Sequence, residues 1–471
     1  MAVKQVARSR ATHSKKCLGS GVGYTQTVGG LLTDLYQLTM SAGYYEAGKT
    51  AEMATFELFF RRLPRYRNFV LSAGLQQTVD YLLNLHFTEE EVRYLETLPQ
   101  FARVSPRFFD LLRSFRFTGD VFAMPEGTPI FAGQPFLTIR APLIEAQIPE
   151  TYLLATIGFQ SLIATKAARI VEVAGGRGVV DFGTRRAHSP EAGVLAGRAA
   201  YIGGCLGTSN TETGFRYGIP VFGTAAHSWI QAFACERDAY ARLQQMLGNA
   251  TVYLIDTYDT IEGARLAAEL GRPLWGVRLD SGNIIELSRA VRRILDEAGL
   301  QDAKIMATSD LNEYKILEYT AAGAPIDAYG VGTDLATSGD SPSLGVVYKM
   351  VELAGRQTAK YSEDKHTVPG SKQVFRFPDH DVIACSWECH GCDTDDAVAL
   401  LRPVILGGKL VEPLPTIQQS RTAASESIRK LPIATRSLFD NEQKYRVEYS
   451  KPLQRLMADV RASRPCPEAV S

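Results

Sequence analysis

The sequence predicts an α/β protein in which parallel strands, covered by helices, form a barrel. Between residues 151 and 355, short apolar segments alternate with helix-like stretches, and polar groups follow these segments directly. Such alternation places the strands in parallel under a helical layer, and about seven of them fit a barrel better than a two-layer sandwich. The expected barrel strands are 179–182, 220–222, 252–255, 274–279, 304–308, 328–331 and 346–351.

The region before the barrel, 29–150, is predicted as an α+β domain. From residue 31 to about residue 114 the pattern is helical, and it begins with the helix-capping residues Thr33 and Asp34. Short strands interrupted by Gly and Pro follow, at 121–124, 129–131 and 135–139.

A long helix is expected at the start of the barrel domain, 151–355, over residues 151–174. Beyond it, 356–471 is predicted as a C-terminal region with strands at 374–376 and 382–384 and a cationic loop, packed on the N-terminal domain. Residues 1–28 hold five cations and no acid, without the apolar core of a secretory signal. A disordered basic tail is expected there in preference to an organelle-targeting peptide.

Composition limits the partners. The 471 residues include 51 Lys and Arg against 51 Asp and Glu, so no overall field attracts nucleic acid or an anionic membrane. No apolar run approaches the roughly 20 residues that cross a bilayer. Seven cysteines, an odd number, indicate a reducing compartment, and we expect a cytoplasmic protein.

Cys385, Cys389, His390 and Cys392 have ligand-like spacing for a structural zinc. The chain has one Cys-x-x-Cys and no second distant pair, so reduced thiols are the favoured interpretation. Any metal in the main site is left open by the sequence.

A Gly-Thr-Ala-Ala-His-Ser-Trp motif at 223–229 carries most of the functional information. It follows the apolar run 219–222, so Thr224 and His227 lie just past a predicted strand, where backbone amides are free and a helix begins. A phosphoryl group can be received at such a place. A lone histidine among apolar residues is, without further context, a core residue.

A second motif upstream has the same plan. Residues 178–186 form a short apolar strand, then a glycine turn, then Arg185 and Arg186. Paired guanidinium groups match carboxylate and phosphate oxygens two at a time, which indicates an anionic substrate.

Together, and in this order, the two motifs resemble those of the nicotinate phosphoribosyltransferase family. The resemblance extends from 32–37 to 365–373. It implies an irregular or incomplete TIM-like α/β barrel, with a flanking α+β domain built from the N-terminal region and a C-terminal extension. It also implies a homodimer that joins nicotinate to phosphoribosyl pyrophosphate in NAD salvage, giving nicotinate mononucleotide and pyrophosphate, with ATP as co-substrate and Mg²⁺ as cofactor.

The resemblance assigns roles to individual residues. It implies that ATP transiently phosphorylates His227, not the nearby His188, and that Arg278, Thr224 and Tyr36 bind nicotinate. A buried structural salt bridge is the alternative for Arg278, and an ordinary helix position is the alternative for Tyr36.

Thr333 is assigned by the same resemblance to phosphoribosyl pyrophosphate. The further residues expected near this substrate are Gly332, Arg186, Ser309, Asp310 and Asp256. Asp280 is expected to face the oxocarbenium-like carbon. Asp259 accompanies Asp256 in a segment that could be mistaken for the substrate motif of Rossmann-like phosphoribosyltransferases.

Lys365, Lys372 and Arg376 flank a Pro-Gly turn, and Lys365 and Lys372 are predicted to belong to a loop over ATP or pyrophosphate. A solvated charge cluster is the alternative. For the whole chain, two other functions stay open: a nicotinamide or quinolinate phosphoribosyltransferase on the same barrel, and a catalytically inactive barrel.

Overall fold

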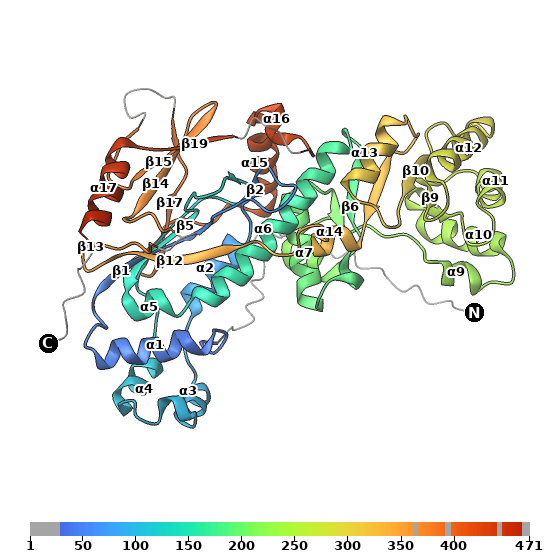
Figure 1. Ribbon diagram of the computed structural model, residues 1–471. Helices are drawn as coiled ribbons and strands as arrows, with labels where there is room; N and C mark the ends of the chain where they lie inside the picture. Colours follow the sequence, from blue (N-terminus) through green and yellow to red (C-terminus); the bar gives the residue numbers. More distant parts are fainter. Residues whose placement is uncertain (1–28, 362–365, 391–396, 440–444, 464–471) are drawn as a thin grey trace, which may run out of the picture.

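The computed structural model describes residues 29–361, 366–390, 397–439 and 445–463. Two large sheets organise these residues, and the helix α6 (Glu150–Val173) runs from one sheet to the other (Figure 1). The predicted basic tail, 1–28, lies outside the described residues. Within the described ranges, no helix combines the length and apolarity that a membrane span requires.

A six-stranded parallel sheet forms one half of the structure. Its order is β7-β6-β11-β10-β9-β8, and every neighbouring pair is parallel. One isolated bridge, Thr208 to Val221, extends the β7 edge, but among the described residues no ladder joins that edge to β8. The barrel is therefore incomplete, as expected. The strands are β6 (Gly178–Asp181), β7 (Gly207–Thr208), β8 (Val252–Leu254), β9 (Gly276–Leu279), β10 (Lys304–Ala307) and β11 (Ala328–Val331).

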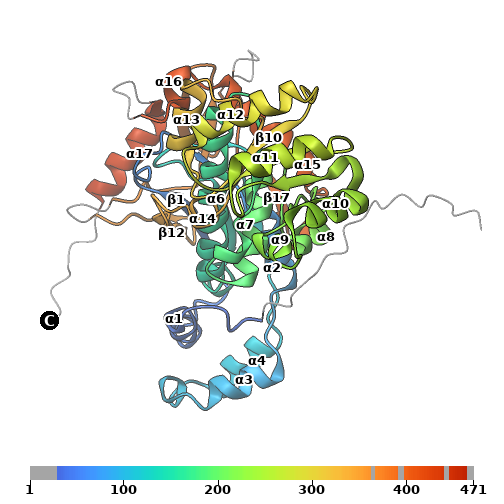
Figure 2. The same cartoon turned by 90° about the vertical axis from the view of Figure 1, so that its right-hand side faces the viewer.

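Helices cover this sheet because its strands are apolar on both faces. Tyr253, Val277, Ile305 and Tyr329 are fully buried at the strand centres. Figure 2, which looks at this half, shows α10, α11 and α12 on the near side. The helices are α7 (Pro190–Ile202), α8 (Thr211–Tyr217), α9 (His227–Gln231), α10 (Glu236–Leu247), α11 (Thr260–Leu270), α12 (Ile284–Glu297), α13 (Glu313–Ala321) and α14 (Thr333–Thr337).

A seven-stranded sheet of antiparallel pairs forms the second half, in the order β13-β12-β1-β5-β3-β17-β18. Its strands are β1 (Met53–Phe60), β3 (Asp120–Ala123), β5 (Leu137–Pro142), β12 (Val346–Leu353), β13 (Arg356–Gln357), β17 (Arg402–Leu406) and β18 (Lys409–Leu410). Its helices are α1 (Leu35–Glu46), α2 (Leu75–Asn84), α3 (Glu89–Glu96), α4 (Pro106–Arg113) and α5 (Leu143–Gln147).

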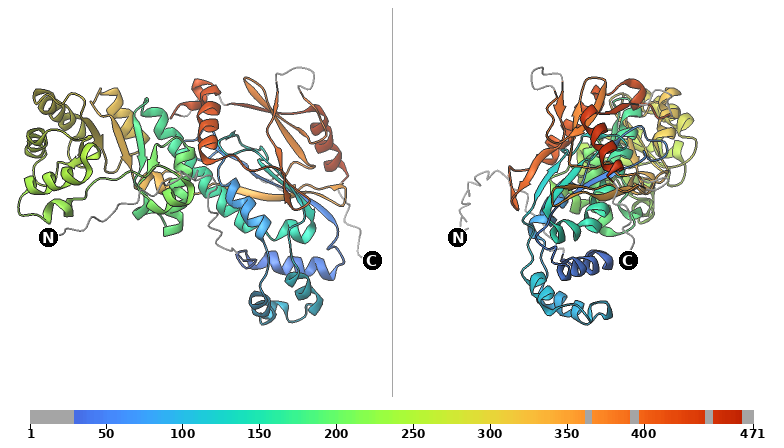
Figure 3. Two further views of the ribbon diagram at one scale, coloured as in Figure 1. Left: turned by 180° about the vertical axis from the view of Figure 1, so that it is seen from behind. Right: turned by 60° about the vertical axis from the view of Figure 1, so that its left-hand side comes forward.

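C-terminal elements complete this half, as expected of a flanking α+β domain. β17 pairs with β3, and a four-stranded sheet of order β16-β14-β15-β19 lies beside the N-terminal strands (Figure 3). The C-terminal elements are β14 (Lys372–Arg376), β15 (His380–Cys385), β16 (Val398–Ala399), β19 (Arg446–Tyr449), α15 (Ile417–Lys430), α16 (Ile433–Arg436) and α17 (Lys451–Ala462); β2 (Val70–Leu71) and β4 (Pro129–Ile130) form a separate pair. Of these, α15 packs against α7 and contributes to the core of the parallel half. The exact domain limits stay a prediction.

Three of the expected secondary-structure assignments are wrong. The supposedly helical stretch 31–114 contains β1, whose uninterrupted burial leaves no alternation for the sequence to display. The segment 346–351 is not a barrel strand, because β12 pairs antiparallel with β1. The segment 220–222 makes only the single bridge at Val221, whereas the two-residue strand β7 is too short for a periodic signal.

Candidate active site

Arg278 is the centre of a polar cluster at the carboxyl ends of β8, β9 and β10. Its side chain is 12% exposed. Nε donates to Thr308 Oγ1 at 2.8 Å, and Nη1 donates to Thr224 Oγ1 at 2.8 Å and to the Ala225 carbonyl at 3.3 Å. Nη2 donates to Asp280 Oδ1 at 2.6 Å. These bonds fix the plane of the guanidinium at the strand ends.

Asp280 joins Arg278 to His227. Its Oδ1 also accepts a hydrogen bond from the Thr308 hydroxyl, and its Oδ2 lies 3.7 Å from His227 Nε2. Burial by itself raises the pKa of the Asp280 carboxyl, but the Thr308 bond and the nearby charges of Arg278 and His227 hold the pKa below its ordinary value. A carboxylate at this position is therefore ionised at neutral pH.

His227 is the first residue of α9, directly after the loop that follows Val221. Its Nδ1 lies 3.2 Å from Thr257 Oγ1, and its side chain is 42% exposed. The imidazole is thus oriented by two strand-end groups and open to a second reactant, so the interpretation as a core histidine is wrong. His188, the other histidine considered, is exposed on the loop before α7.

Asp256 follows β8 and supports the turn after β9. Its Oδ2 accepts from the Asp280 amide at 3.2 Å and from the Ser281 hydroxyl at 2.5 Å. Its Oδ1 is buried and has no hydrogen-bond partner among the described residues. Asp259 instead caps the helix α11, because its Oδ1 accepts hydrogen bonds from the amides of Ile261 and Glu262.

An unpartnered carboxylate oxygen beside a second carboxylate is a donor set that suits Mg²⁺, which binds one or two protein carboxylates together with substrate phosphates. Asp256 Oδ1 is the unpartnered oxygen, and Asp280, whose backbone amide donates to Asp256 Oδ2 at 3.2 Å, is the second carboxylate residue. Within the described ranges, no group of three or more His, Cys, Asp or Glu side chains surrounds a metal position. A metal here would need phosphate oxygens from a substrate.

Two further turns complete the mouth of the barrel. Ser309 and Asp310, after β10, both have left-handed backbones with φ of 73° and 46°. Such conformations cost roughly 1–3 kcal/mol each in residues other than glycine, so neighbouring structure must hold them. Gly332 precedes α14, and Thr333 begins that helix and is exposed.

The arginines of the second motif reach the surface. Arg185 and Arg186 are exposed in a short 3₁₀ turn, and neither guanidinium group makes a hydrogen bond or ion pair to another described residue. Asp181, just before them, is buried: it accepts from the Gly183 amide and the Thr208 hydroxyl at 2.8 and 2.7 Å. Asp181 therefore holds β6 and β7 together, and the two guanidinium groups are the free cations of this turn.

Two expected site residues lie elsewhere. Tyr36 is on α1, in the antiparallel half, where its side chain is 49% exposed and far from α9 (Figures 1 and 2). One chain alone does not bring Tyr36 to Arg278.

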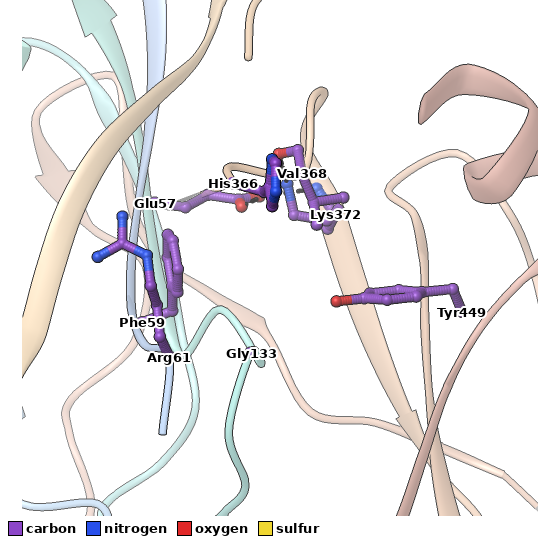
Figure 4. A pocket seen from close by; sticks show the side chains of 8 residues that line it. All are labelled: Glu57, Phe59, Arg61, Gly133, His366, Val368, Lys372 and Tyr449. Carbon is purple, nitrogen blue, oxygen red and sulfur yellow. Dashed lines mark hydrogen bonds and ion pairs between the residues drawn. The ribbon is translucent and has the colours of Figure 1, made fainter. Parts of the chain in front are cut away.

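Lys372 is not on a loop: it opens β14, its side chain is 4% exposed, and its ammonium pairs with buried Glu57 at 2.7 Å. The same ammonium donates to the carbonyls of Val368 and Gly370. Figure 4 shows Lys372 and Glu57 in the wall of a pocket in the antiparallel half, which Tyr449 of β19 also lines. Lys365 and Cys392 lie outside the described residues, and Arg376 is bound to Asp381 at 2.7 Å.

The sequence missed Thr257 and Thr308, which orient His227, Arg278 and Asp280. Both are hydroxyl residues at or just after a barrel strand, so the strand-end rule that found Asp256 and Ser309 would also have found them.

The cluster draws its groups from the ends of several neighbouring parallel strands, which is where α/β-barrel enzymes place their active sites. The fold and the site thus define the class: an enzyme of the α/β-barrel type.

Comparison with known proteins gives the particular family. Three family models match the chain: the N-terminal domain of nicotinate phosphoribosyltransferase at 31–158, the nicotinate phosphoribosyltransferase family model at 178–404, and the C-terminal domain at 371–457. Nicotinate phosphoribosyltransferase pncB2 of Mycobacterium tuberculosis is 43% identical over 435 residues, covering 90% of this chain and 92% of the relative. The human enzyme of that name is 32% identical, covering 91% and 96%. The chain belongs to the nicotinate phosphoribosyltransferase family.

Solved structures agree with this assignment. The crystal structure of human nicotinic acid phosphoribosyltransferase superposes with a TM-score of 0.81 and 29% identity, covering 91% of this chain and 100% of that one. Nicotinate-nucleotide pyrophosphorylase from Pyrococcus furiosus follows with a TM-score of 0.71 and 27% identity, covering 85% and 95%.

Proposed function

We propose that this enzyme transfers the phosphoribosyl group of phosphoribosyl pyrophosphate to nicotinate at the barrel mouth, in NAD salvage. The observation that carries the proposal is the convergence of Arg278, Asp280 and His227 in one cluster. Arg278 supplies a fixed, partly exposed cation for the nicotinate carboxylate, with Thr224 beside it.

The reaction forms a bond from the pyridine nitrogen to the anomeric carbon and breaks the bond from that carbon to pyrophosphate. The nitrogen lone pair is already nucleophilic, so no general base is required. Positive charge develops on the sugar as pyrophosphate leaves, and the ionised Asp280 carboxylate would stabilise it. Thr333 with Gly332, Ser309 and the free guanidinium of Arg186 would hold the phosphate groups, and Asp256 the ribose or the metal.

Mg²⁺ held by Asp256 and Asp280 would neutralise charge on the leaving pyrophosphate. Asp256 would then have two roles, because its Oδ2 already accepts a hydrogen bond from the Asp280 amide in the turn after β9.

ATP coupling is proposed to act through His227. The imidazole attacks the γ-phosphorus, ADP leaves, and water later releases the phosphate from the phosphohistidine. The added negative charge would lie next to Asp280 and within reach of Arg278, so it would alter how the mouth holds the second anionic substrate.

Substrate choice among pyridines follows from the charge of the pocket. Nicotinamide requires an acceptor for its amide protons, whereas nicotinate requires a cation, which Arg278 provides. Quinolinate, which also carries carboxylates that a cation can bind, is the second substrate to test.

A cytoplasmic location and a homodimer are proposed with this function. In a homodimer, the exposed Tyr36 of one copy would be available to the mouth of the other, and it offers a flat face to a pyridine ring.

The direct test measures nucleotide formation from nicotinate, nicotinamide and quinolinate with phosphoribosyl pyrophosphate, each with and without ATP. We expect nicotinate to give by far the largest kcat/KM, and ATP to increase it. Turnover of quinolinate or nicotinamide in preference to nicotinate would refute the assignment, and binding of phosphoribosyl pyrophosphate without any product would indicate an inactive barrel.

A further inference from the structure

A buried ionic cluster lies beside two of the turns at the barrel mouth, apart from Arg278 and His227. Its centre is Lys166 of α6, whose side chain is 1% exposed. The ammonium lies 2.6 Å from Glu313 Oε2, 2.5 Å from Asp334 Oδ2 and 2.9 Å from Asp340 Oδ1. One cation thus binds three carboxylates, one at the start of α13 and two in α14 and the turn after it.

Two arginines complete the cluster. Arg67, in the loop after β1, binds Asp340 with both terminal nitrogens at 2.7 and 2.9 Å. Arg169, one turn after Lys166 on α6, donates to Glu313 at 3.0 Å. Burial by itself lowers the pKa of the Lys166 ammonium, but the carboxylates of Glu313 and Asp334 raise it above its ordinary value. Three cations face three carboxylates, so the cluster is electrically balanced without an outside ion.

The partners of Lys166 begin two helices that start at the mouth. Glu313 is the first residue of α13, which follows the left-handed turn at Ser309 and Asp310. Asp334 is the second residue of α14 and directly follows Thr333. Lys166 therefore holds the starts of both helices together.

Fold stability alone does not account for this placement. A buried ion pair gains little over an apolar contact of equal size, because removing two charges from water offsets their attraction. A fixed charge geometry does, however, hold its partners within a narrow range of positions, and small displacements of binding groups are costly in catalysis. The strained turn at Ser309 and Asp310 needs such a constraint.

We propose that Lys166 is a positioning residue, which through Asp334 and Glu313 holds the Gly332–Thr333 and Ser309–Asp310 turns in the geometry that binds phosphoribosyl pyrophosphate. The proposal rests on the function proposed above. Arg278 also binds Thr308, next to Ser309, but no hydrogen bond or ion pair among the described residues joins Arg278 or Thr224 to Asp334, so a change at Asp334 separates the two substrates. Through Asp340 and Arg67, it also links the N-terminal domain to the phosphate turns.

The test uses Asp334→Asn in the full-length enzyme, because this isosteric change removes the charge that ties α14 to Lys166. The matched control is Asp327→Asn: Asp327 pairs with Lys304 at 3.2 Å, immediately before β11, whereas Asp334 follows the same strand. KM for each substrate, kcat, equilibrium binding of phosphoribosyl pyrophosphate and the thermal midpoint are measured for both variants.

We expect Asp334→Asn to raise KM and Kd for phosphoribosyl pyrophosphate about tenfold, less than the roughly hundredfold effect of a 1 Å misplacement, with little change for nicotinate. Asp327→Asn should change neither constant. Should Asp334→Asn fail to fold, Lys166→Arg keeps the charge in an altered geometry and is expected to show the same selective loss.

An equal loss for both substrates, an unchanged affinity in Asp334→Asn, or the same loss in Asp327→Asn would overturn the positioning role while leaving the proposed function intact. A wild-type enzyme that neither binds nor turns over phosphoribosyl pyrophosphate would overturn both.

Discussion

The imidazole Nε2 of His227 lies 3.7 Å from Oδ2 of Asp280, and the same carboxylate binds Arg278 through its other oxygen. A single carboxylate therefore connects the proposed phosphate acceptor to the proposed nicotinate anchor. Any change of charge on the imidazole acts directly on the carboxylate that binds Arg278.

Replacing His227 separates ATP coupling from the transfer itself. We expect His227→Ala to lose both ATP stimulation and incorporation of label from γ-labelled ATP, while nucleotide formation without ATP continues, because the transfer needs no base. The measurement is labelled protein after gel filtration, together with rates at several ATP concentrations. His188→Ala, an exposed histidine outside the cluster, is the control and should label normally; label retained by His227→Ala would disprove the assignment.

Replacing the guanidinium of Arg278 by an ammonium tests whether Arg278 binds nicotinate. Arg278→Lys keeps the charge but cannot bind Thr308, Thr224 and Asp280 together. Loss of one charge-assisted hydrogen bond of about 1.5–3 kcal/mol predicts a rise in KM for nicotinate of about 10- to 100-fold. Steady-state kinetics with varied nicotinate measures it. Arg292→Lys is the control. Arg292 lies on α12, and its side chain donates to the carbonyls of Ala303 and Leu300 after that helix. If only KM for phosphoribosyl pyrophosphate rose, Arg278 would not be the group that binds nicotinate.

The lowered pKa of Asp280 predicts a stability effect in acid. A carboxyl with a folded-state pKa below its unfolded value of about 3.9 stabilises the fold fully above that pH, and this stabilisation is lost as the pH falls through the folded-state pKa. Asp280→Asn should thus be less stable than the wild type near neutrality, and the difference should shrink below about pH 4. Urea midpoints at pH 6, 4 and 3 give the comparison. Exposed Asp302→Asn serves as reference, and a difference that grows in acid would contradict the argument.

The buried pair of Lys372 and Glu57 predicts a large stability loss. Lys372→Met leaves the Glu57 carboxylate buried and unpaired, which costs about 3–5 kcal/mol. The double variant Lys372→Met with Glu57→Gln should recover part of this loss. Denaturant unfolding measures both variants, and KM for ATP should stay unchanged in any folded protein. A stable Lys372→Met enzyme with a raised KM for ATP would instead support a ligand-binding role.

Strand-end chemistry could be predicted from sequence because it is local. An apolar run, a turn and a polar group lie within a few residues of one another at Asp256, Arg278 and Asp280, and the parallel βα pattern places these ends at one edge. The family resemblance then gave their expected roles.

Other features depend on partners far away in the chain. β12 has a strand-like sequence, but only its pairing with β1 decides that it leaves the barrel. Lys372 follows a Pro-Gly turn like a solvent-exposed cation, and only the proximity of Glu57 makes it a buried ion pair. Lys166 sits in the middle of a helix, where its sequence neighbours give no sign of the three carboxylates around it.

By itself, the sequence determined the fold class, the family and the chemical groups at the mouth, because these depend on periodicity and on short motifs. The tertiary structure alone decided which charges meet: His227 with Asp280, Lys166 with Asp334, Lys372 with Glu57. The physical reason is that electrostatic and hydrogen-bonding energies depend on separation in space and on burial, neither of which is set by distance along the chain.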